Sequence, residues 1–178
     1  MNPAINSSAE LAPTHGSEQR AGDNTGSAAA ATEFISFAIG DEQYGVDIMA
    51  VREIKGWSNV TPLPNQPDYM RGVLNLRGVM VPIVDLRCRF GQGLTDATSM
   101  HIVIVVQVGA RTVGLLADRV LDIIAVDTSQ IQPVPQVSRH ARADFLAGLV
   151  TVEATLIALL NLNQLLSEQT EVEPHATP

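Results

Sequence analysis

Short hydrophobic runs separated by polar turn residues dominate the pattern along the middle of this chain. The runs are rich in Val, Ile and Leu, which suit the pleated and largely buried surface of a β-sheet. Neighbouring runs flank short turns, as the strands of β-hairpins do. The pattern therefore predicts four hairpins, with strands at 34–39 and 44–46, 73–76 and 79–84, 102–108 and 112–116, and 149–152 and 155–160.

Helical signals are few and short. Residues 48–54 carry hydrophobic side chains three positions apart, which predicts a helix of about two turns. Residues 67–70 begin with proline and predict one helical turn. Residues 161–166 predict a short helix capped by Asn161 or Asn163. Many short strands joined by Gly and Pro turns indicate an all-β fold of small barrels or a sandwich.

The same pattern occurs twice along the chain. Three segments of the first half are echoed in the second half, in the same order and at similar spacing. The matching pairs are 44–54 with 113–123, 60–64 with 131–135, and 72–86 with 148–162. We therefore expect two similar halves, 33–98 and 99–166, and two small β-barrels packed on a shared core.

Polar residues dominate both ends of the chain. Residues 1–32 are rich in Ser, Ala, Gly, Asn and Thr and contain almost no large hydrophobic side chains. Such a segment cannot bury enough surface to offset the entropy lost on ordering, so we expect a disordered tail. Residues 167–178 carry three Glu and no Lys or Arg, and we expect a second polar tail there.

Charge and cysteine content exclude several classes of function. The net charge is −8 and no cluster of basic and aromatic residues exists, which argues against nucleic acid as a partner. Cys88 is the single cysteine, so no disulfide forms within the chain, as expected for a cytoplasmic protein. We expect neither a signal peptide nor insertion into a membrane, because no hydrophobic run approaches the ~20 residues of a membrane helix.

Few residues have the spacing that catalysis or metal binding requires. No two of the four histidines have metal-ligand spacing, and no Cys-x-x-Cys pair exists, so we expect no metal and no cofactor. Motifs of nucleophilic hydrolases and of nucleotide-binding loops are absent from the sequence. A small β-barrel enzyme with a dispersed site stays open as an alternative, although no motif supports it.

Two further features have both a chemical and a structural interpretation. Cys88 lies between two arginines that would lower its pKa, but a small half-buried residue is the simpler interpretation. Asp85, Asp118 and Asp122 would make a carboxylate cluster if the fold brought them together. Because these three aspartates belong to three different elements, we interpret them as turn residues or helix caps.

The two copies of the pattern differ at the tip of one hairpin. The first copy has Arg77-Gly78 where the second has Glu153-Ala154. Gly78 permits the positive φ angle of a tight turn, which is a structural role. Arg77 offers five hydrogen-bond donors and a permanent charge, so it is a candidate binding residue. An ion pair with Glu53 is the structural alternative.

Around this tip the chain resembles the CheW family of chemotaxis coupling proteins. The resemblance covers essentially all of residues 33–166, and its most specific part is Asn-Leu-Arg-Gly at 75–78 with Val-Pro-Ile-Val-Asp-Leu downstream. The matching positions are 40–48, 51–54, 61–64, 72–78, 81–86, Gly109, Gly114, Asp118, Val120, 131–133 and 159–162.

The resemblance implies two SH3-like, five-stranded β-barrels packed on one another, with short helices. It also implies a noncatalytic adaptor that couples chemoreceptors, the methyl-accepting chemotaxis proteins, to the regulatory domain of the histidine kinase CheA. Such adaptors are cytoplasmic and join receptor arrays at the membrane without entering it. An adaptor of a different chemosensory-type kinase pathway, serving motility or development, is the alternative.

The resemblance further implies a set of contact residues. Four positions match family positions tied to receptor or kinase binding: Val51, Glu53, Gly72 and Arg77. Ile48 and Ile54 are expected as hydrophobic contacts on the kinase-facing barrel. Val103 and Val120 are expected to line a groove between the barrels that receives a receptor helix. Burial in the core is the alternative for Val51, Val103 and Val120.

Overall fold

The computed structural model describes residues 31–135 and 142–167. They form two five-stranded sheets and a few short helices, which confirms the all-β prediction. The first strand begins at Ala31, so residues 31 and 32 belong to a sheet, and the other residues predicted as tails, except Ser167, lie outside the described ranges. Within those ranges no helix is long and hydrophobic enough to span a membrane.

All four predicted hairpins are present, and each has at least one strand that is longer than predicted. They are β1 (Ala31–Ile39) with β2 (Glu42–Asp47), β4 (Met70–Leu76) with β5 (Val79–Asp85), β6 (Ile102–Val108) with β7 (Arg111–Ala117), and β9 (Leu146–Val152) with β10 (Thr155–Leu160). Two single strands complete the sheets, β3 (Val51–Gly56) and β8 (Arg119–Asp127).

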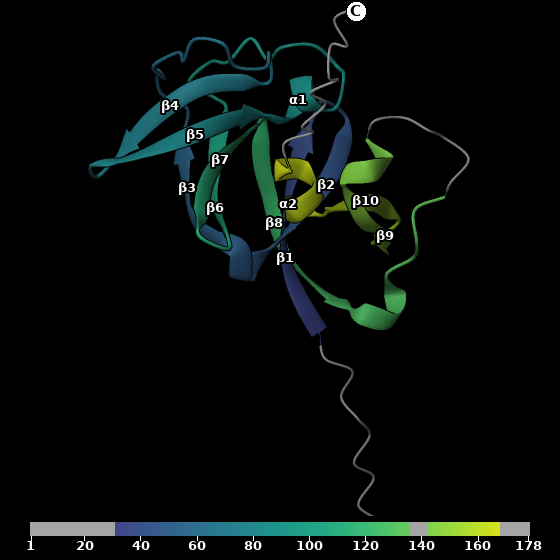
Figure 1. The fold of residues 1–178 in the computed structure, drawn as a ribbon. Coiled ribbons are helices and arrows are strands. Elements are labelled where there is room, and N and C mark those ends of the chain that lie inside the picture. The colour runs from purple at the N-terminus through teal and green to yellow at the C-terminus, as the bar shows by residue number, and fades with distance from the viewer. Residues whose placement is uncertain (1–30, 136–141, 168–178) are drawn as a thin grey trace, which may run out of the picture.

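Each sheet draws its strands from both halves of the sequence, as the mixed colours of the two barrels in Figure 1 show. The strand order is β8-β1-β2-β10-β9 in sheet A and β3-β6-β7-β5-β4 in sheet B. Parallel contacts of β2 with β10 and of β5 with β7 join the strands of one half to those of the other. The halves are therefore similar, but each barrel needs strands from both.

Matching glycines show that the two sheets are built alike. In the parallel contacts, Gly45 of β2 pairs with Leu159 of β10, and Gly114 of β7 pairs with Ile83 of β5. A Cβ atom at Gly45 would lie 2.8 Å from Leu159 Cδ2, and one at Gly114 would lie 2.4 Å from Ile83 Cδ1. The sequence repeat matches the same positions, since it aligns Gly45 with Gly114 and Ile83 with Leu159.

Buried hydrophobic side chains form three clusters that follow this arrangement. One cluster lies on sheet B and includes Ile83, and another lies on sheet A and includes Leu159. The third and largest cluster takes residues from both sheets, with Phe37 of sheet A and Leu115 of sheet B at its fully buried centre. Because each buried side chain of this size contributes about 1.5–3 kcal/mol, the shared cluster holds the two barrels together as one unit.

The short helices agree in part with the sequence prediction. A helix at 48–54 is wrong: one 3-10 turn, η1 (Ile48–Ala50), is followed at once by strand β3. In β3 half-buried and exposed residues alternate, and over so short a segment a spacing of three does not separate a helix from a strand. α2 (Leu162–Leu166) is capped by Asn161, as predicted, and α1 (Leu86–Arg89) is capped by Asp85 at the equivalent place.

Single turns also lie between the longer elements of the described chain. Residues 67–70, predicted as one helical turn, instead form a non-helical hydrogen-bonded turn that leads into β4, in which the Met70 N–H donates to the Pro67 carbonyl over 2.8 Å. η2 (Thr128–Gln130) follows β8, and η3 (Ala143–Phe145) precedes β9.

Candidate interaction surface

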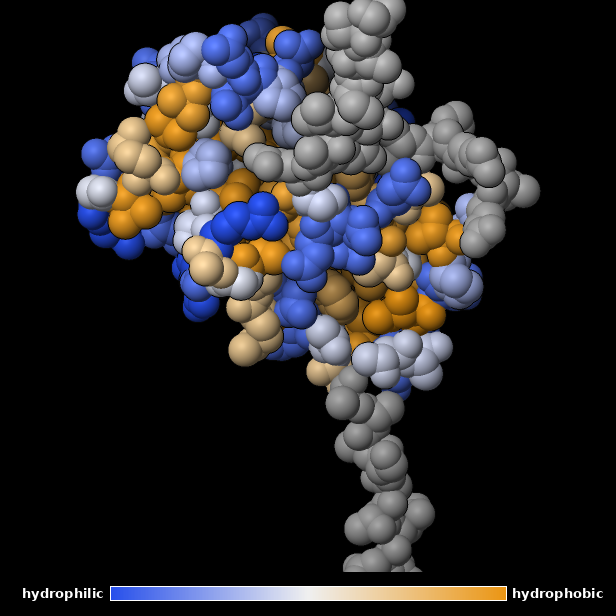
Figure 2. Space-filling model, viewed as in Figure 1, coloured by the Kyte–Doolittle hydropathy of each residue, from blue (hydrophilic) through white to orange (hydrophobic). Residues whose placement is uncertain are grey.

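A tight turn projects Arg77 from the end of the β4–β5 hairpin. Arg77 and Gly78 have positive φ angles of 51° and 87°, and the Gly78 N–H donates to Asn75 Oδ1 over 2.8 Å. This turn holds the guanidinium outside the barrel, with 85% of the Arg77 side chain exposed. Figure 2 shows hydrophobic surface over the same hairpin, where Val79 and Met80 are exposed.

An ion pair joins this tip to the opposite edge of sheet B. Arg77 Nη2 donates to Glu53 Oε2 of β3 over 2.5 Å, so the ion pair considered for Arg77 in the sequence is present. β3 and β4 are the two edge strands of sheet B, and the contact therefore spans the gap that the curved sheet leaves open. An exposed ion pair contributes at most about 1 kcal/mol to stability, so Arg77 can exchange Glu53 for a partner at low cost.

A cavity of about 350 Å³ adjoins the ion pair. Its walls are residues 53–55 of β3 and residues 75–77 of the hairpin. Ile54 is 40% exposed there, so a hydrophobic side chain and an ion pair lie on one surface. Lys55 and Leu76 are lining residues that the sequence analysis did not select, although each directly neighbours a selected one in sequence.

The tip of the β9–β10 hairpin repeats this backbone with different chemistry. Glu153 and Ala154 have φ angles of 48° and 67°, so the same turn is made there without glycine. In β8, Asp122 stands at the position that the sequence repeat aligns with Glu53. At the two positions that carry the ion pair in the first copy, the second copy of the pattern therefore has two carboxylates.

The hydrophobic residues expected as contacts differ in exposure. Ile48, Val51 and Val120 are half-buried at the edge of the shared central cluster, and each keeps some accessible surface. Val103 is completely buried in the cluster on sheet B. Its expected place in a groove is therefore wrong, because the side chain of this β6 residue points into the barrel and has no surface for a partner.

Gly72 is a buried residue with a structural role. Its φ angle is 131°, and a Cβ atom there would lie 2.2 Å from the Thr61 carbonyl oxygen. The glycine lets the chain at Thr61 approach β4 closely enough for two hydrogen bonds with Val73, of 2.8 and 2.9 Å. A side chain at this position would disturb the hairpin that carries Arg77.

Asp85 is completely buried and caps α1. Its carboxylate accepts hydrogen bonds from the Thr95 N–H (2.8 Å), the Thr95 hydroxyl (2.7 Å) and the Cys88 N–H (3.2 Å), and Arg71 Nη1 lies 3.4 Å away. Burial, followed by the charges of Asp85 and Asp68, raises the pKa of the Cys88 thiol, with Arg71 opposing the shift. The two arginines beside Cys88 therefore do not activate it.

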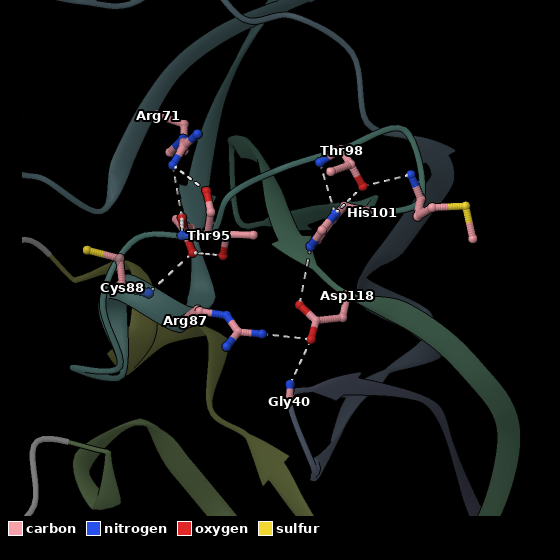
Figure 3. Close-up of polar contacts among 10 residues, drawn as sticks. Gly40, Arg71, Arg87, Cys88, Thr95, Thr98, His101 and Asp118 are labelled. Atoms are coloured by element: carbon pink, nitrogen blue, oxygen red, sulfur yellow. Dashed lines mark hydrogen bonds and ion pairs between the residues drawn. The ribbon is translucent and has the colours of Figure 1, made fainter.

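Asp118 connects elements of both sheets (Figure 3). It accepts hydrogen bonds from the Gly40 N–H (2.7 Å) and from Arg87 Nη2 (2.8 Å), and His101 Nε2 lies 3.7 Å from its other oxygen. These contacts tie the β1–β2 turn, α1 and the start of β6 to one carboxylate. Among residues 31–135 and 142–167, no group of three His, Cys, Asp or Glu side chains is placed to hold a metal ion.

Comparison with known proteins identifies the family. The family model of the CheW-like domain matches residues 33–170. The chain belongs to the CheW-like family. The probable chemotaxis protein CheW of Rhizobium etli is 45% identical to it over 136 residues, 76% of this chain and 88% of that protein. The chemotaxis protein CheW of Klebsiella aerogenes is 39% identical over 137 residues, 77% of this chain and 82% of that protein.

A solved structure agrees with this CheW-like assignment. The scaffolding protein TtCheW from Thermoanaerobacter tengcongensis aligns with a TM-score of 0.71 at 29% identity, over 79% of this chain and 90% of that one. The predicted family and the predicted pair of SH3-like barrels are therefore confirmed.

Within this CheW-like domain, the candidate residues divide into three groups. Glu53, Ile54 and Arg77 share one accessible surface on sheet B. Ile48, Val51 and Val120 lie at the edge of the core between the barrels, and Gly72 and Val103 are buried. The exposed Val79 and Met80 at the tip are candidates that the sequence analysis missed, because their outward direction depends on how sheet B curls.

Proposed function

We propose that this protein is a noncatalytic scaffold that couples chemoreceptors to the histidine kinase CheA in the cytoplasm. Membership of the CheW-like family supports this function, as do the relatives that are named chemotaxis proteins and the neighbour that is named a scaffolding protein. The chemistry of the polar groups also favours a scaffold, because Asp85 and Asp118 serve as a helix cap and a structural link.

The observation that carries the proposal is the exposed Arg77 held at the tip by its turn and by Glu53. Arginine is enriched in the energetically dominant positions of protein interfaces, where its planar guanidinium binds carboxylates with two hydrogen bonds. Ile54, Val79 and Met80 supply the hydrophobic surface that such an anchor needs around it. We assign this surface to the kinase.

The receptor is assigned to the edge of the core between the barrels. Ile48, Val51 and Val120 expose part of their hydrophobic surface there, and a helix that inserts apolar side chains would bury it. Gly72 contributes indirectly, because its substitution would move the hairpin that carries Arg77.

Binding of purified full-length chain to the CheA regulatory domain and to a receptor signalling fragment tests the function. We expect Arg77→Ala to weaken assembly of the three proteins at least about tenfold, a change of ~1.4 kcal/mol. Its effect on stability should stay below about 1 kcal/mol, because the ion pair with Glu53 is exposed. Glu153→Ala, at the equivalent tip, is the matched control and should bind normally.

Failure of the folded wild-type chain to bind either protein would refute the proposal. Co-purification from the native cell identifies the kinase. Recovery of a chemosensory-type kinase other than CheA would support the alternative pathway in motility or development.

A further inference from the structure

A groove of about 710 Å³ lies between α2 and sheet B. Its hydrophobic walls include Met70 and Val84 of the sheet, Val113 of β7, and Leu166 of α2. Arg89 and Arg111 also line it, and none of the described residues that line it is acidic. The groove therefore combines a hydrophobic wall with two positive charges.

The equivalent site on sheet A is filled. The sequence repeat aligns Tyr44 of β2 with Val113, and the Tyr44 ring stacks between Phe37 and Phe90 with centroid distances of 5.9 and 5.0 Å. Extended through α1 and α2 at the same spacing, the repeat aligns Phe90 with Leu166. Smaller side chains at both positions leave the groove open on sheet B.

The filled site also contains a hydrogen bond from Gln92, a residue that follows α1. Gln92 Nε2 donates to Glu42 Oε2 over 2.8 Å. In the sequence repeat Arg111 is the equivalent of Glu42, and Glu168 is the equivalent of Gln92. At the filled site the pair consists of the Gln92 amide and the Glu42 carboxylate. At the open groove the equivalent positions carry the Glu168 carboxylate and the Arg111 guanidinium.

The two arginines already hold the end of α2 at the groove. Arg111 Nη1 donates to the Leu166 carbonyl over 3.2 Å, and Arg89 Nη2 donates to the carbonyls of Leu165 (3.2 Å) and Ser167 (3.3 Å). Arg89 Nε is buried and has no hydrogen-bond partner among residues 31–135 and 142–167. Ser167, which immediately precedes Glu168, is itself a lining residue.

We propose that residues 168–178 occupy this groove, with the Glu168 carboxylate accepting hydrogen bonds from Arg111. Glu168 directly follows Ser167, a lining residue, so the Cα atoms of the two residues are ~3.8 Å apart. The segment carries three Glu and no Lys or Arg, which complements the two arginines. The C-terminal segment then completes sheet B's side of the fold, as the chain after α1 completes that of sheet A.

Methyl NMR of the full chain and of a chain that ends at Ser167 tests the occupancy. Signals of Met70, Val84 and Val113 should shift on truncation, although these residues are far from the cut in sequence. The signal of Val150, inside the barrel of sheet A, is the control and should stay unchanged. A synthetic peptide of residues 168–178, added at millimolar concentration, should move the groove signals back toward their positions in the full chain.

Identical groove signals in the two chains would refute the proposal. Groove signals of the full chain that move with protein concentration would also refute it, because a second copy would then be the occupant. Neither arm uses a receptor or a kinase, so the outcome is independent of the proposed scaffold function.

Charge reversal tests the Glu168–Arg111 pair itself. Arg111→Glu should shift the groove signals toward those of the truncated chain, and Glu168→Arg in the same chain should restore them. Arg119→Glu, a reversal at an exposed arginine of β8, is the matched control and should leave the signals in place. If the double variant restores the groove signals, the Glu168–Arg111 pair is supported. If the signals stay shifted in the double variant, the pair is refuted.

Discussion

The two hairpin tips have the same backbone and opposite chemistry. Arg77-Gly78 and Glu153-Ala154 both form turns with two positive φ angles, although glycine is present in only one of them. The geometry of the tip is therefore set by the strands that it joins, and the charge of the tip is free to differ. In sheet B the tip carries an arginine that is paired with Glu53. The barrel of sheet B is therefore the better candidate for a binding surface.

The helix caps give the largest expected difference between the halves. Asp85→Ala would leave the buried donors of Thr95 without an acceptor and Arg71 without its partner, which should cost about 3–5 kcal/mol. Asn161→Ala removes one hydrogen bond, to the Gln164 N–H, and should cost about 1 kcal/mol. Urea unfolding of both variants measures the difference, and equal losses would show that the buried network adds nothing to capping.

Glycines at equivalent places in β4 and β9 give the next largest difference. Gly72→Ala places a Cβ 2.2 Å from a backbone oxygen and strains a φ angle of 131°, so we expect a loss of about 2–4 kcal/mol. At Gly148 the nearest atom to a Cβ is Ile131 Cγ2 at 2.5 Å, a side chain that can move, and Gly148→Ala should cost about 1–2 kcal/mol. Thermal unfolding ranks the two, and a larger loss at Gly148 would contradict this account.

Tyr44 is the residue of sheet A that has no aromatic counterpart at Val113 in sheet B. Burial and then the hydrogen bond to Glu42 raise the pKa of Tyr44 to about 12. Because the neutral phenol is favoured in the folded protein, its contribution to stability is present below pH 10 and is lost as the pH rises through about 12.

Alkaline titration of phenolate absorbance in Tyr69→Phe, which leaves Tyr44 as the single tyrosine, measures this pKa. Glu42→Gln should lower the midpoint, because it removes the neighbouring charge. An unchanged midpoint would assign the shift to burial alone.

Local features of the fold were predictable, and features that depend on sheet packing were not. The hairpins followed from short hydrophobic runs around turns, and the cap at Asn161 followed from its side-chain chemistry. The exchange of strands between halves was not predictable, because the hydrophobic pattern locates each strand and its buried face but not the strand that lies beside it. Val103 was misplaced because its hydrophobic neighbours in β6 are buried on both faces of the strand.

The candidate site shows the same division. Glu53 was predictable as the partner of Arg77 because an exposed arginine favours a nearby carboxylate, and the family resemblance selected both residues. The cavity beside them was not predictable, since it exists only where the edges β3 and β4 approach each other.

The second residue of each tip gives the smallest expected changes in stability and the most direct test of the shared backbone. Gly78→Ala should lower stability by about 1 kcal/mol, because alanine is strained at a positive φ angle. Ala154→Gly should relieve that strain and raise stability by about 0.5 kcal/mol, after the entropy cost of glycine in the unfolded chain is subtracted. Unfolding midpoints of the two variants provide the measurement. A loss of stability in both would mean that the β9–β10 tip does not hold the turn of its counterpart, and that the two tips differ in backbone as well as in charge.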